Sequence, residues 1–180
     1  QKTSQEYLLY ILESKKKETD NDIEKVFIRY LEKQQRNFAL DFDDLLNFTL
    51  YIFVNNSDIL EKWQKRLHYI QVDETQDSSQ KQFMLIEMLS QFHKNLFIVG
   101  DPDQTIYEWR GAKPEILIDF DKRFTDSKTI VMNQNYRSTP NILNLGNHII
   151  KNNKIRVDKD MFTQNPEGVE VVHFHGENDY

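Results

Sequence analysis

Short apolar runs alternate with longer amphipathic stretches along most of the chain. The runs at 67–72, 96–99 and 129–132 have the length and composition of buried strands. Between and after them, apolar residues recur at the spacing of a helix with one buried face. Helices are predicted at 41–53, 77–92, 114–123 and 140–150. This alternation is typical of an α/β fold in which helices flank a parallel sheet.

Two further elements are predicted toward the ends of the chain. Residues 5–38 show helical periodicity in two blocks, and the polar stretch between them, with its run of three lysines, is interpreted as a solvated loop. Residues 169–174 follow a turn signal and alternate as a strand does. The apolar faces of the two helical blocks comprise Tyr7, Leu8, Ile11 and Leu12, and then Ile23, Phe27, Tyr30 and Leu31.

Two of the helices have recognisable starts. Asp41 is a suitable N-cap and is followed by acidic residues that suit the helix dipole, while residues 77–79 can cap the next helix. The buried stripe of the first helix is predicted to be Phe42, Leu45, Leu46, Thr49, Leu50 and Phe53. The inward face of the second is predicted to be Phe83, Leu85, Ile86, Leu89 and Phe92.

Composition restricts the class of protein. The 180 residues include no cysteine, which excludes disulfides and thiolate metal sites and fits a reducing, cytoplasmic location. No apolar run approaches the ~18 residues needed to span a bilayer. The net charge of −6 argues against broad electrostatic binding of DNA. Any contact with nucleic acid must therefore be local, and aromatic stacking is the obvious means.

Three polar strings follow the three predicted strands. They read V-D-E-T-Q-D at 72–77, G-D-P-D-Q-T-I-Y-E-W-R-G-A at 100–112 and N-Q-N-Y-R-S at 133–138. Ligands of open parallel sheets bind outside the carboxyl ends of the strands, which is where these side chains emerge. In this order the strings resemble motifs II, III and IV of the UvrD/Rep/PcrA-type superfamily 1 DNA helicases. The resemblance runs from about Asp41 to the end of the chain.

The resemblance implies a fold and a division into domains. It implies a RecA-like P-loop NTPase fold, with 41–128 as the second half of a first motor domain and 129–180 as the beginning of a second. Residues 1–40 would be the tail of a helical insertion in the first motor domain. The implied ligands are ATP, Mg²⁺ and single-stranded DNA, together with the remaining segments of a parent helicase.

Asp73 and Glu74 are the candidate catalytic acids. Mg²⁺ in phosphate sites is held by one or two carboxylates together with substrate oxygens and waters, a role that suits Asp73. Glu74 can orient and deprotonate the attacking water as a general base. The amide of Gln104 can contact a γ-phosphate and that water together, because it both donates and accepts. In the resembled family this glutamine couples the state of the nucleotide to the DNA path.

The remaining candidate residues bind DNA or the nucleotide. Tyr107, Trp109 and Arg110 lie close together in the second string, and stacking of bases on aromatic rings tolerates any sequence. By resemblance, Tyr136 stacks on the adenine and Arg137 reaches the γ-phosphate. Phe42 also has a place near the single strand by resemblance, although its ring would equally serve as core. The candidate residues for binding DNA are thus Phe42, Tyr107, Trp109 and Arg110. The candidate residues for binding and hydrolysing the nucleotide are Asp73, Glu74, Gln104, Tyr136 and Arg137.

The sequence lacks one expected motif. A P-loop needs G-x-x-x-x-G-K-[ST], and none of the five glycines is followed by lysine. We therefore expect a central fragment of a helicase that is inactive by itself. A nucleic-acid-binding module with vestigial ATPase motifs and the motor part of a helicase–nuclease stay open as alternatives. A metal pair at His173 and His175 is disfavoured because no cysteine and no clear third ligand accompany it.

Overall fold

The computed structural model describes residues 21–153, 156–157 and 159–176. The chain divides into two compact units. The first comprises Gln1–Asp73 and Ser79–Val99, and the second comprises Glu74–Ser78 and Gly100–Tyr180. The first predicted helical block, with Tyr7 and Ile11, lies outside the described residues.

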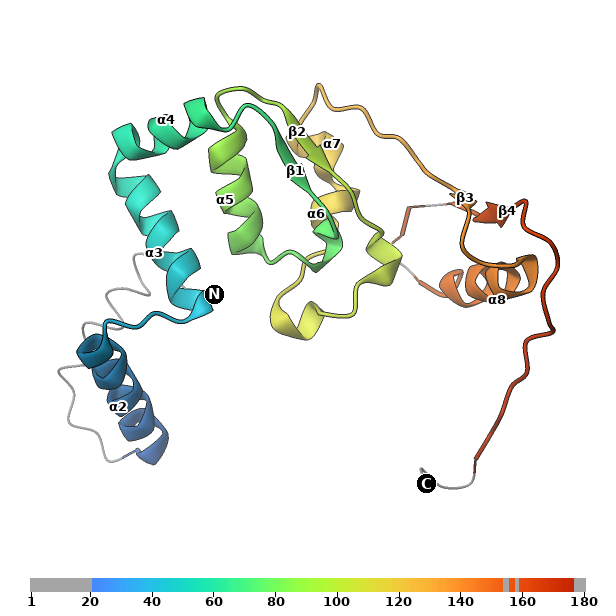
Figure 1. Cartoon of the computed structure of the whole chain (residues 1–180), viewed down its shortest axis with the longest axis horizontal. Coiled ribbons are helices and arrows are strands. Elements are labelled where there is room, and N and C mark those ends of the chain that lie inside the picture. Colours follow the sequence, from blue (N-terminus) through green and yellow to red (C-terminus); the bar gives the residue numbers. More distant parts are fainter. Residues whose placement is uncertain (1–20, 154–155, 158, 177–180) are drawn as a thin grey trace. The chain divides into compact units, whose positions relative to one another are not determined.

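The first unit contains two short parallel strands and four described helices (Figure 1). Its strands β1 (Ile70–Val72) and β2 (Leu96–Ile98) pair with Ile70 opposite Leu96. Its helices are α2 (Asp22–Asn37), α3 (Phe42–Asn55), α4 (Ser57–Arg66) and α5 (Gln80–Ser90). The parallel pairing confirms the prediction that neighbouring strands run in the same direction.

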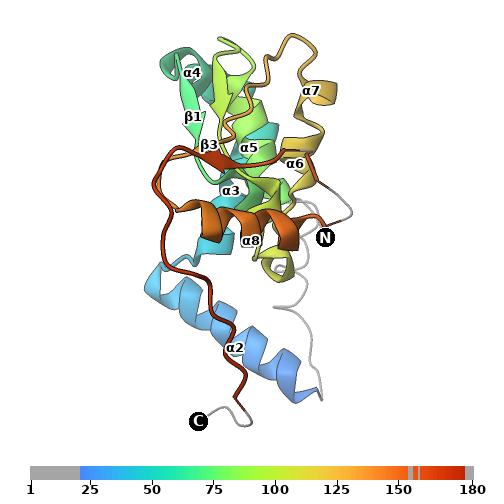
Figure 2. The ribbon, with the colours of Figure 1, turned by 90° about the vertical axis from the view of Figure 1, so that its right-hand side faces the viewer.

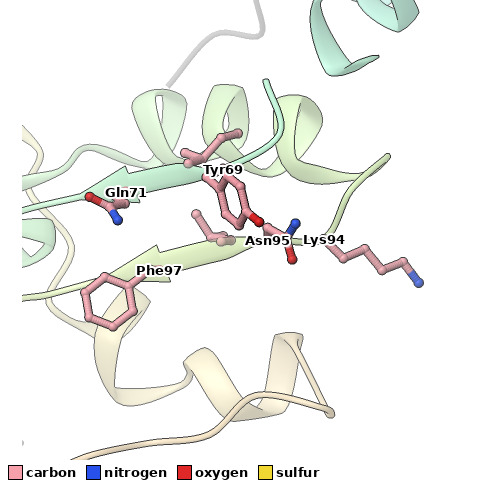
Figure 3. Close-up of a pocket in the computed structure, with 7 residues that line it drawn as sticks. Tyr69, Gln71, Lys94, Asn95 and Phe97 are labelled. Atoms are coloured by element: carbon pink, nitrogen blue, oxygen red, sulfur yellow. The ribbon is translucent and has the colours of Figure 1, made fainter. Parts of the chain in front are cut away.

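The two strands are shorter and more exposed than the apolar runs predicted. Residues on a strand alternate between faces, and only one face of this ribbon is partly covered. Phe97 on the other face is 58% exposed. Figure 3 shows Tyr69, Gln71 and Phe97 along this open face, where they line a shallow pocket with Lys94 and Asn95.

The core of the first unit forms where α3, α4 and α5 pack together. Phe83 of α5 is fully buried, and Leu50 and Phe53 of α3 are nearly so. Ser79 caps α5, as the sequence predicted, and Gln82 completes a capping box that was not predicted. Phe92 is half-exposed, contrary to the predicted inward face, because α5 ends at Ser90 before reaching it.

Helix α3 begins where predicted, and its predicted stripe is buried only in part: Leu50 and Phe53 are buried as predicted, whereas its first half buries polar residues instead. Asp41 caps it in a capping box with Asp44. Asp44 is buried because it accepts a hydrogen bond from Gln34 of α2 (2.7 Å), and Asn47 is buried because it accepts one from Lys81 of α5 (2.7 Å). These polar contacts turn Phe42 outward, so that it is 91% exposed and its interpretation as a core residue is wrong.

Other members of the predicted apolar faces are also exposed. Leu45 of α3 is half-exposed, and Ile23 and Tyr30 of α2 lie largely in solvent. Leu31 is the member of the α2 face that is buried. Tyr30 instead donates a hydrogen bond to Asp41 (2.7 Å), which ties its ring edge to the start of α3.

The described residues of the second unit form short turns, three helices and a second parallel strand pair. The 3₁₀ turns are η1 (Thr75–Asp77), η2 (Pro102–Gln104) and η3 (Glu108–Arg110). The helices are α6 (Glu115–Ile118), α7 (Phe120–Arg123) and α8 (Pro140–Ile150), and the strands are β3 (Gln134–Asn135) and β4 (Phe162–Thr163). Helix α6 packs on η1 and η2, with Ile116 buried, and α8 lies against the β3–β4 pair (Figure 2).

The structure corrects three predictions in this unit. The run at 129–132 is not a strand and is exposed, because the pairing with β4 begins only at Gln134. The helix predicted at 114–123 breaks at Asp119, whose backbone leaves the helical conformation (ψ 16°). Residues 169–174 form no strand, because within the described part of the chain no neighbouring strand takes up their backbone groups. The helix at 140–150 is confirmed.

The described residues thus form a mixed helix and strand fold with two small parallel sheets. The complete RecA-like sheet and the division at 40/41 and 128/129 stay predictions. None of the described helices is long and apolar enough to cross a membrane.

We expect Phe83→Ala to lower the free energy of unfolding by about 3–5 kcal/mol, because the ring is fully buried and its loss leaves a cavity. Met84→Ala on the same helix is the matched control. Met84 is 44% exposed, so its truncation should change stability by about 0.5 kcal/mol or less. Urea unfolding followed by circular dichroism measures both, and equal losses would contradict the assigned core.

Candidate functional site

Glu74 leaves β1 in an unusual backbone conformation. It adopts the left-handed region (φ 49°, ψ 41°) and is followed at once by η1, whose Thr75 and Gln76 are buried. A non-glycine residue in this region costs roughly 1–2 kcal/mol, so the surrounding contacts must hold it there. This backbone conformation directs the exposed Glu74 side chain back toward the turn that follows it, where it reaches Gln76.

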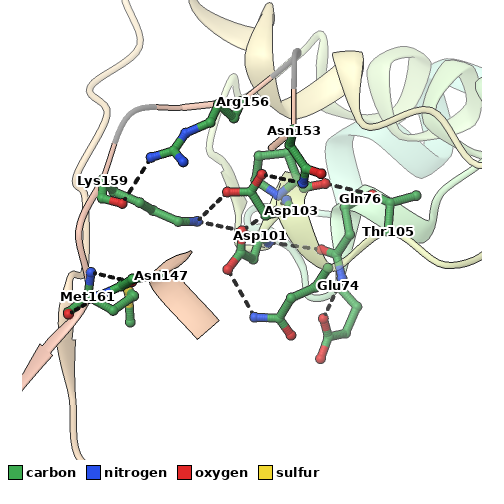
Figure 4. A network of polar contacts seen from close by, with 12 residues as sticks. Glu74, Gln76, Asp101, Asp103, Thr105, Asn147, Asn153, Arg156, Lys159 and Met161 are labelled. Carbon is green, nitrogen blue, oxygen red and sulfur yellow. Dashed lines mark hydrogen bonds and ion pairs between the residues drawn. The ribbon is translucent and has the colours of Figure 1, made fainter. Parts of the chain in front are cut away.

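The buried Gln76 joins the turn after β1 to the loop after β2 (Figure 4). Its Nε2 donates to Glu74 Oε2 (2.8 Å), and its Oε1 accepts from the backbone N–H of Asp101 (3.1 Å). Gly100 makes room for this side chain. A Cβ at position 100 would overlap Gln76 Oε1 and lie 2.7 Å from Leu117 Cδ1, so no larger residue fits without displacing them.

Asp101 collects hydrogen bonds on both of its carboxylate oxygens. Oδ1 accepts from Lys159 Nζ and from the Asp103 N–H, and Oδ2 accepts from Gln104 Nε2 (2.9 Å). Burial alone would raise the pKa of Asp101, but the hydrogen bonds from Lys159 and Gln104 outweigh it and hold that pKa below its ordinary value.

Asp103 completes this polar cluster. Its side chain is 3% exposed; Oδ1 accepts from Asn153 Nδ2 (3.1 Å), and Oδ2 lies 3.9 Å from Lys159 Nζ. We call Glu74, Gln76, Asp101, Asp103, Gln104 and Lys159 the acid–amide cluster. Glu74 and Gln104, two of the residues predicted from sequence, are thus linked within it through Gln76 and Asp101.

The other predicted nucleotide residues lie outside these contacts. Asp73 is exposed and directly follows β1. Tyr136 is 74% exposed in the loop after β3. The backbone N–H of Arg137 donates to Asn135 Oδ1 (2.9 Å), which shapes that loop. Their proposed roles therefore stay predictions.

The predicted DNA-binding aromatics are at the surface. Trp109 is 79% exposed and Tyr107 is 38% exposed, on and beside η3. The Arg110 guanidinium lies over both rings, 5.4 Å from the Trp109 centroid and 5.7 Å from that of Tyr107. A cation–π contact at such an exposed site is worth about 0.5–1 kcal/mol.

His173 and His175 have ring centroids 6.5 Å apart. Among the described residues, no group of three or more histidine, cysteine or acidic side chains could hold a metal ion. A hydrated Mg²⁺ with a nucleotide needs fewer protein ligands, and the exposed carboxylate of Asp73 fits its preference for oxygen.

Sequence reasoning missed four members of the acid–amide cluster. Gln76, Asp101 and Asp103 lie inside the recognised strings, and the position of Gln76, two residues after the acidic Glu74, was the signal that could have identified it. Lys159 had no signal, because it lies 58 residues from its partner in a segment without a motif.

A parallel strand pair followed by acidic and amide side chains is an arrangement of nucleotide-binding α/β proteins. Residues 1–125 match the family described as UvrD/REP helicase N-terminal domain. The chain belongs to this family.

Curated relatives agree with this assignment. The chain is 46% identical over 147 residues to a probable DNA helicase II homolog of Mycoplasma capricolum, a match that covers 82% of the chain and 20% of the relative. It is 40% identical over 161 residues to the ATP-dependent DNA helicase PcrA of Bacillus subtilis, covering 89% and 22%. It is 43% identical over 150 residues to PcrA of Staphylococcus aureus, covering 83% and 20%. The chain thus spans about a fifth of the length of these relatives.

The lowered pKa of Asp101 predicts a pH-dependent contribution to stability. Ionised Asp101 stabilises the fold above the ordinary aspartate pKa of about 3.9, and this contribution is lost as the pH falls through the lower folded value. Thermal unfolding of the wild type and of Asp101→Asn should therefore differ most near neutral pH and converge as the pH falls below the lowered pKa of Asp101. A difference that stays constant with pH would show that the carboxylate charge is not the cause.

Proposed function

We propose that this chain is the central part of an ATP-dependent DNA helicase that couples ATP hydrolysis to movement along single-stranded DNA. One observation carries the proposal: in a chain of the UvrD/REP family, Glu74 and Gln104 belong to one hydrogen-bonded cluster. The relatives that are named ATP-dependent DNA helicases support the same activity.

In this proposal each candidate side chain has a distinct task. Glu74 takes the proton of the attacking water, and its hydrogen bond from Gln76 orients the carboxylate for this. Asp73 holds Mg²⁺, which when bound neutralises charge on the phosphates. Gln104 senses the terminal phosphate. Tyr136 stacks on the adenine, and Arg137 stabilises negative charge from the second motor domain.

The proposed domain arrangement follows the family. Residues 1–40 end a helical insertion, 41–128 form the second half of a first RecA-like domain, and 129–180 begin a second one. We expect the 180-residue chain alone not to hydrolyse ATP, because it contains no G-x-x-x-x-G-K-[ST] cradle for the phosphates.

Glu74→Gln in the full-length protein should lower the rate of DNA-stimulated ATP hydrolysis by about 10²–10⁴-fold, because the amide cannot accept the proton. Binding of ATP should persist, since the size of the side chain is kept. The matched control is Glu115→Gln, an exposed glutamate at the start of α6, which should hydrolyse ATP at the wild-type rate. Steady-state turnover with an oligothymidine measures all three proteins. Wild-type turnover in Glu74→Gln would exclude the proposed base.

Trp109→Ala should weaken binding of single-stranded DNA by about 1–3 kcal/mol, because one stacking surface is lost. Turnover without DNA should change little, whereas stimulation by DNA should fall. Trp63→Ala is a matched control, since Trp63 is also exposed and also lies under an arginine, Arg66 (5.5 Å). Fluorescence anisotropy of a labelled oligothymidine at fixed salt gives the affinities. Equal affinity of the two variants would make Trp109 a surface residue without a role in DNA binding.

A further inference from the structure

Lys159 is a largely buried lysine in the segment just before β4. Its side chain is 14% exposed and its ammonium faces two carboxylates, those of Asp101 and Asp103 (Figure 4). A charge in such surroundings is expensive unless it is paired and hydrogen-bonded. The two acids provide that pairing, and neither belongs to the segment that carries Lys159.

The contact fixes the orientation of the Asp101 carboxylate. With Lys159 and the Asp103 N–H on Oδ1, the second oxygen Oδ2 is left pointing at Gln104 Nε2. The Gln104 side chain is otherwise exposed to solvent. Its direction in this structure is therefore set by a carboxylate that Lys159 and the Asp103 N–H hold together, and Lys159 is the side-chain donor of the two.

We propose that Lys159 is a positioning residue for the hydrolysis reaction: it holds Asp101, and Asp101 in turn orients the Gln104 amide. The same aspartate is linked through its backbone N–H to Gln76 and so to Glu74. Lys159 therefore acts on Gln104 through the Asp101 carboxylate, and Asp101 is the residue that joins Lys159 to both polar groups proposed to act on the water. This inference rests on the proposed ATP hydrolysis.

Loss of the ammonium has a definite consequence for the cluster. Without Lys159, the carboxylates of Asp101 and Asp103 lie close together with their shared cation removed. Like charges at such a distance repel each other, so Asp101 turns away and Gln104 loses its anchor. The reacting groups stay in the chain but are misplaced, which lowers kcat more than it alters nucleotide binding.

The same segment offers a matched control. Lys151 forms an ion pair with Asp160 at 3.7 Å, but both side chains are well exposed, at 60% and 68%. Exposed ion pairs contribute little. Lys151→Met removes the same charge from the same region without touching the acid–amide cluster.

The test uses the full-length protein and steady-state ATP hydrolysis with saturating oligothymidine. Lys159→Met should lower kcat by about ten- to a hundredfold, with KM for ATP changed by less than about twofold. Lys159→Arg keeps the charge and should recover most of the lost kcat. Lys151→Met should equal the wild type. A kcat in Lys159→Met equal to that of Lys151→Met, or an Arg variant as slow as the Met variant, would overturn the proposal.

A second variant tests the link between Lys159 and Asp101. Asp101→Asn should lower kcat with KM unchanged, and the double variant with Lys159→Met should be no slower than the worse single variant, because both remove one interaction. Independent, multiplying losses would overturn the proposal. Should Lys159→Met not fold, Asp101→Asn carries the test alone, and wild-type kcat in it decides against the proposal.

Failure of the proposed function is distinguishable from failure of this inference. If the wild type and Glu74→Gln turn over ATP equally, the assigned reaction is wrong. If Glu74→Gln is inactive while Lys159→Met matches the wild type, the reaction stands and Lys159 has only a structural role.

Discussion

The buried carboxamide of Gln76 is the constraint on which the candidate site depends. A buried amide must satisfy a donor and an acceptor at once, and Gln76 is 2% exposed. Its oxygen faces the Asp101 N–H, which can only donate, so its nitrogen must point the other way, toward Glu74. The group at position 74 must therefore be an acceptor. The orientation of one amide thus requires a hydrogen-bond acceptor at the position proposed for the base, and the carboxylate of Glu74 is one.

Hydrogen-bonded polar side chains and an exposed aromatic side chain lie close together in the sequence that follows β2. Asp101 and Asp103 are held by several partners and the nearby ammonium offsets their charge. Trp109, only a few residues further on, presents most of its ring to solvent. A single exposed aromatic ring is common on protein surfaces, so the exposure of Trp109 permits the proposed stacking on a base but does not require it.

Local signals in the sequence predicted local structure well. The caps at Asp41 and Ser79 and the helix at 140–150 follow from neighbouring residues alone. The strands expected at 129–132 and 169–174 did not form, since an apolar pattern shows that a segment can pair but not that a partner is present. Leu50 and Phe53 of α3 are buried as predicted, but the face at the start of α3 was mispredicted because periodicity treats Asp44 and Asn47 as exposed.

The sequence predicted those residues of the candidate site whose own short motif gives their role. Glu74 and Gln104 were named from the residues around them, and the structure links them. Asp101 was overlooked although it stands in the same string as Gln104, because its role depends on a partner that no local pattern reveals. The RecA-like sheet and the domain boundaries stay predictions, since they concern segments that pair over long distances.

The spacing of the contacts in the acid–amide cluster has a consequence for the order in which it forms. Glu74 and Gln76 are two residues apart and Asp101 and Gln104 are three apart, so these contacts close as soon as their turns form. The bond between Gln76 and Asp101 closes a loop of 25 residues, and that between Lys159 and Asp101 one of 58. Loop closure becomes slower and costs more entropy as the loop lengthens. During synthesis, the acidic turns therefore emerge and fold before their lysine exists, and the cluster acquires its counter-charge last.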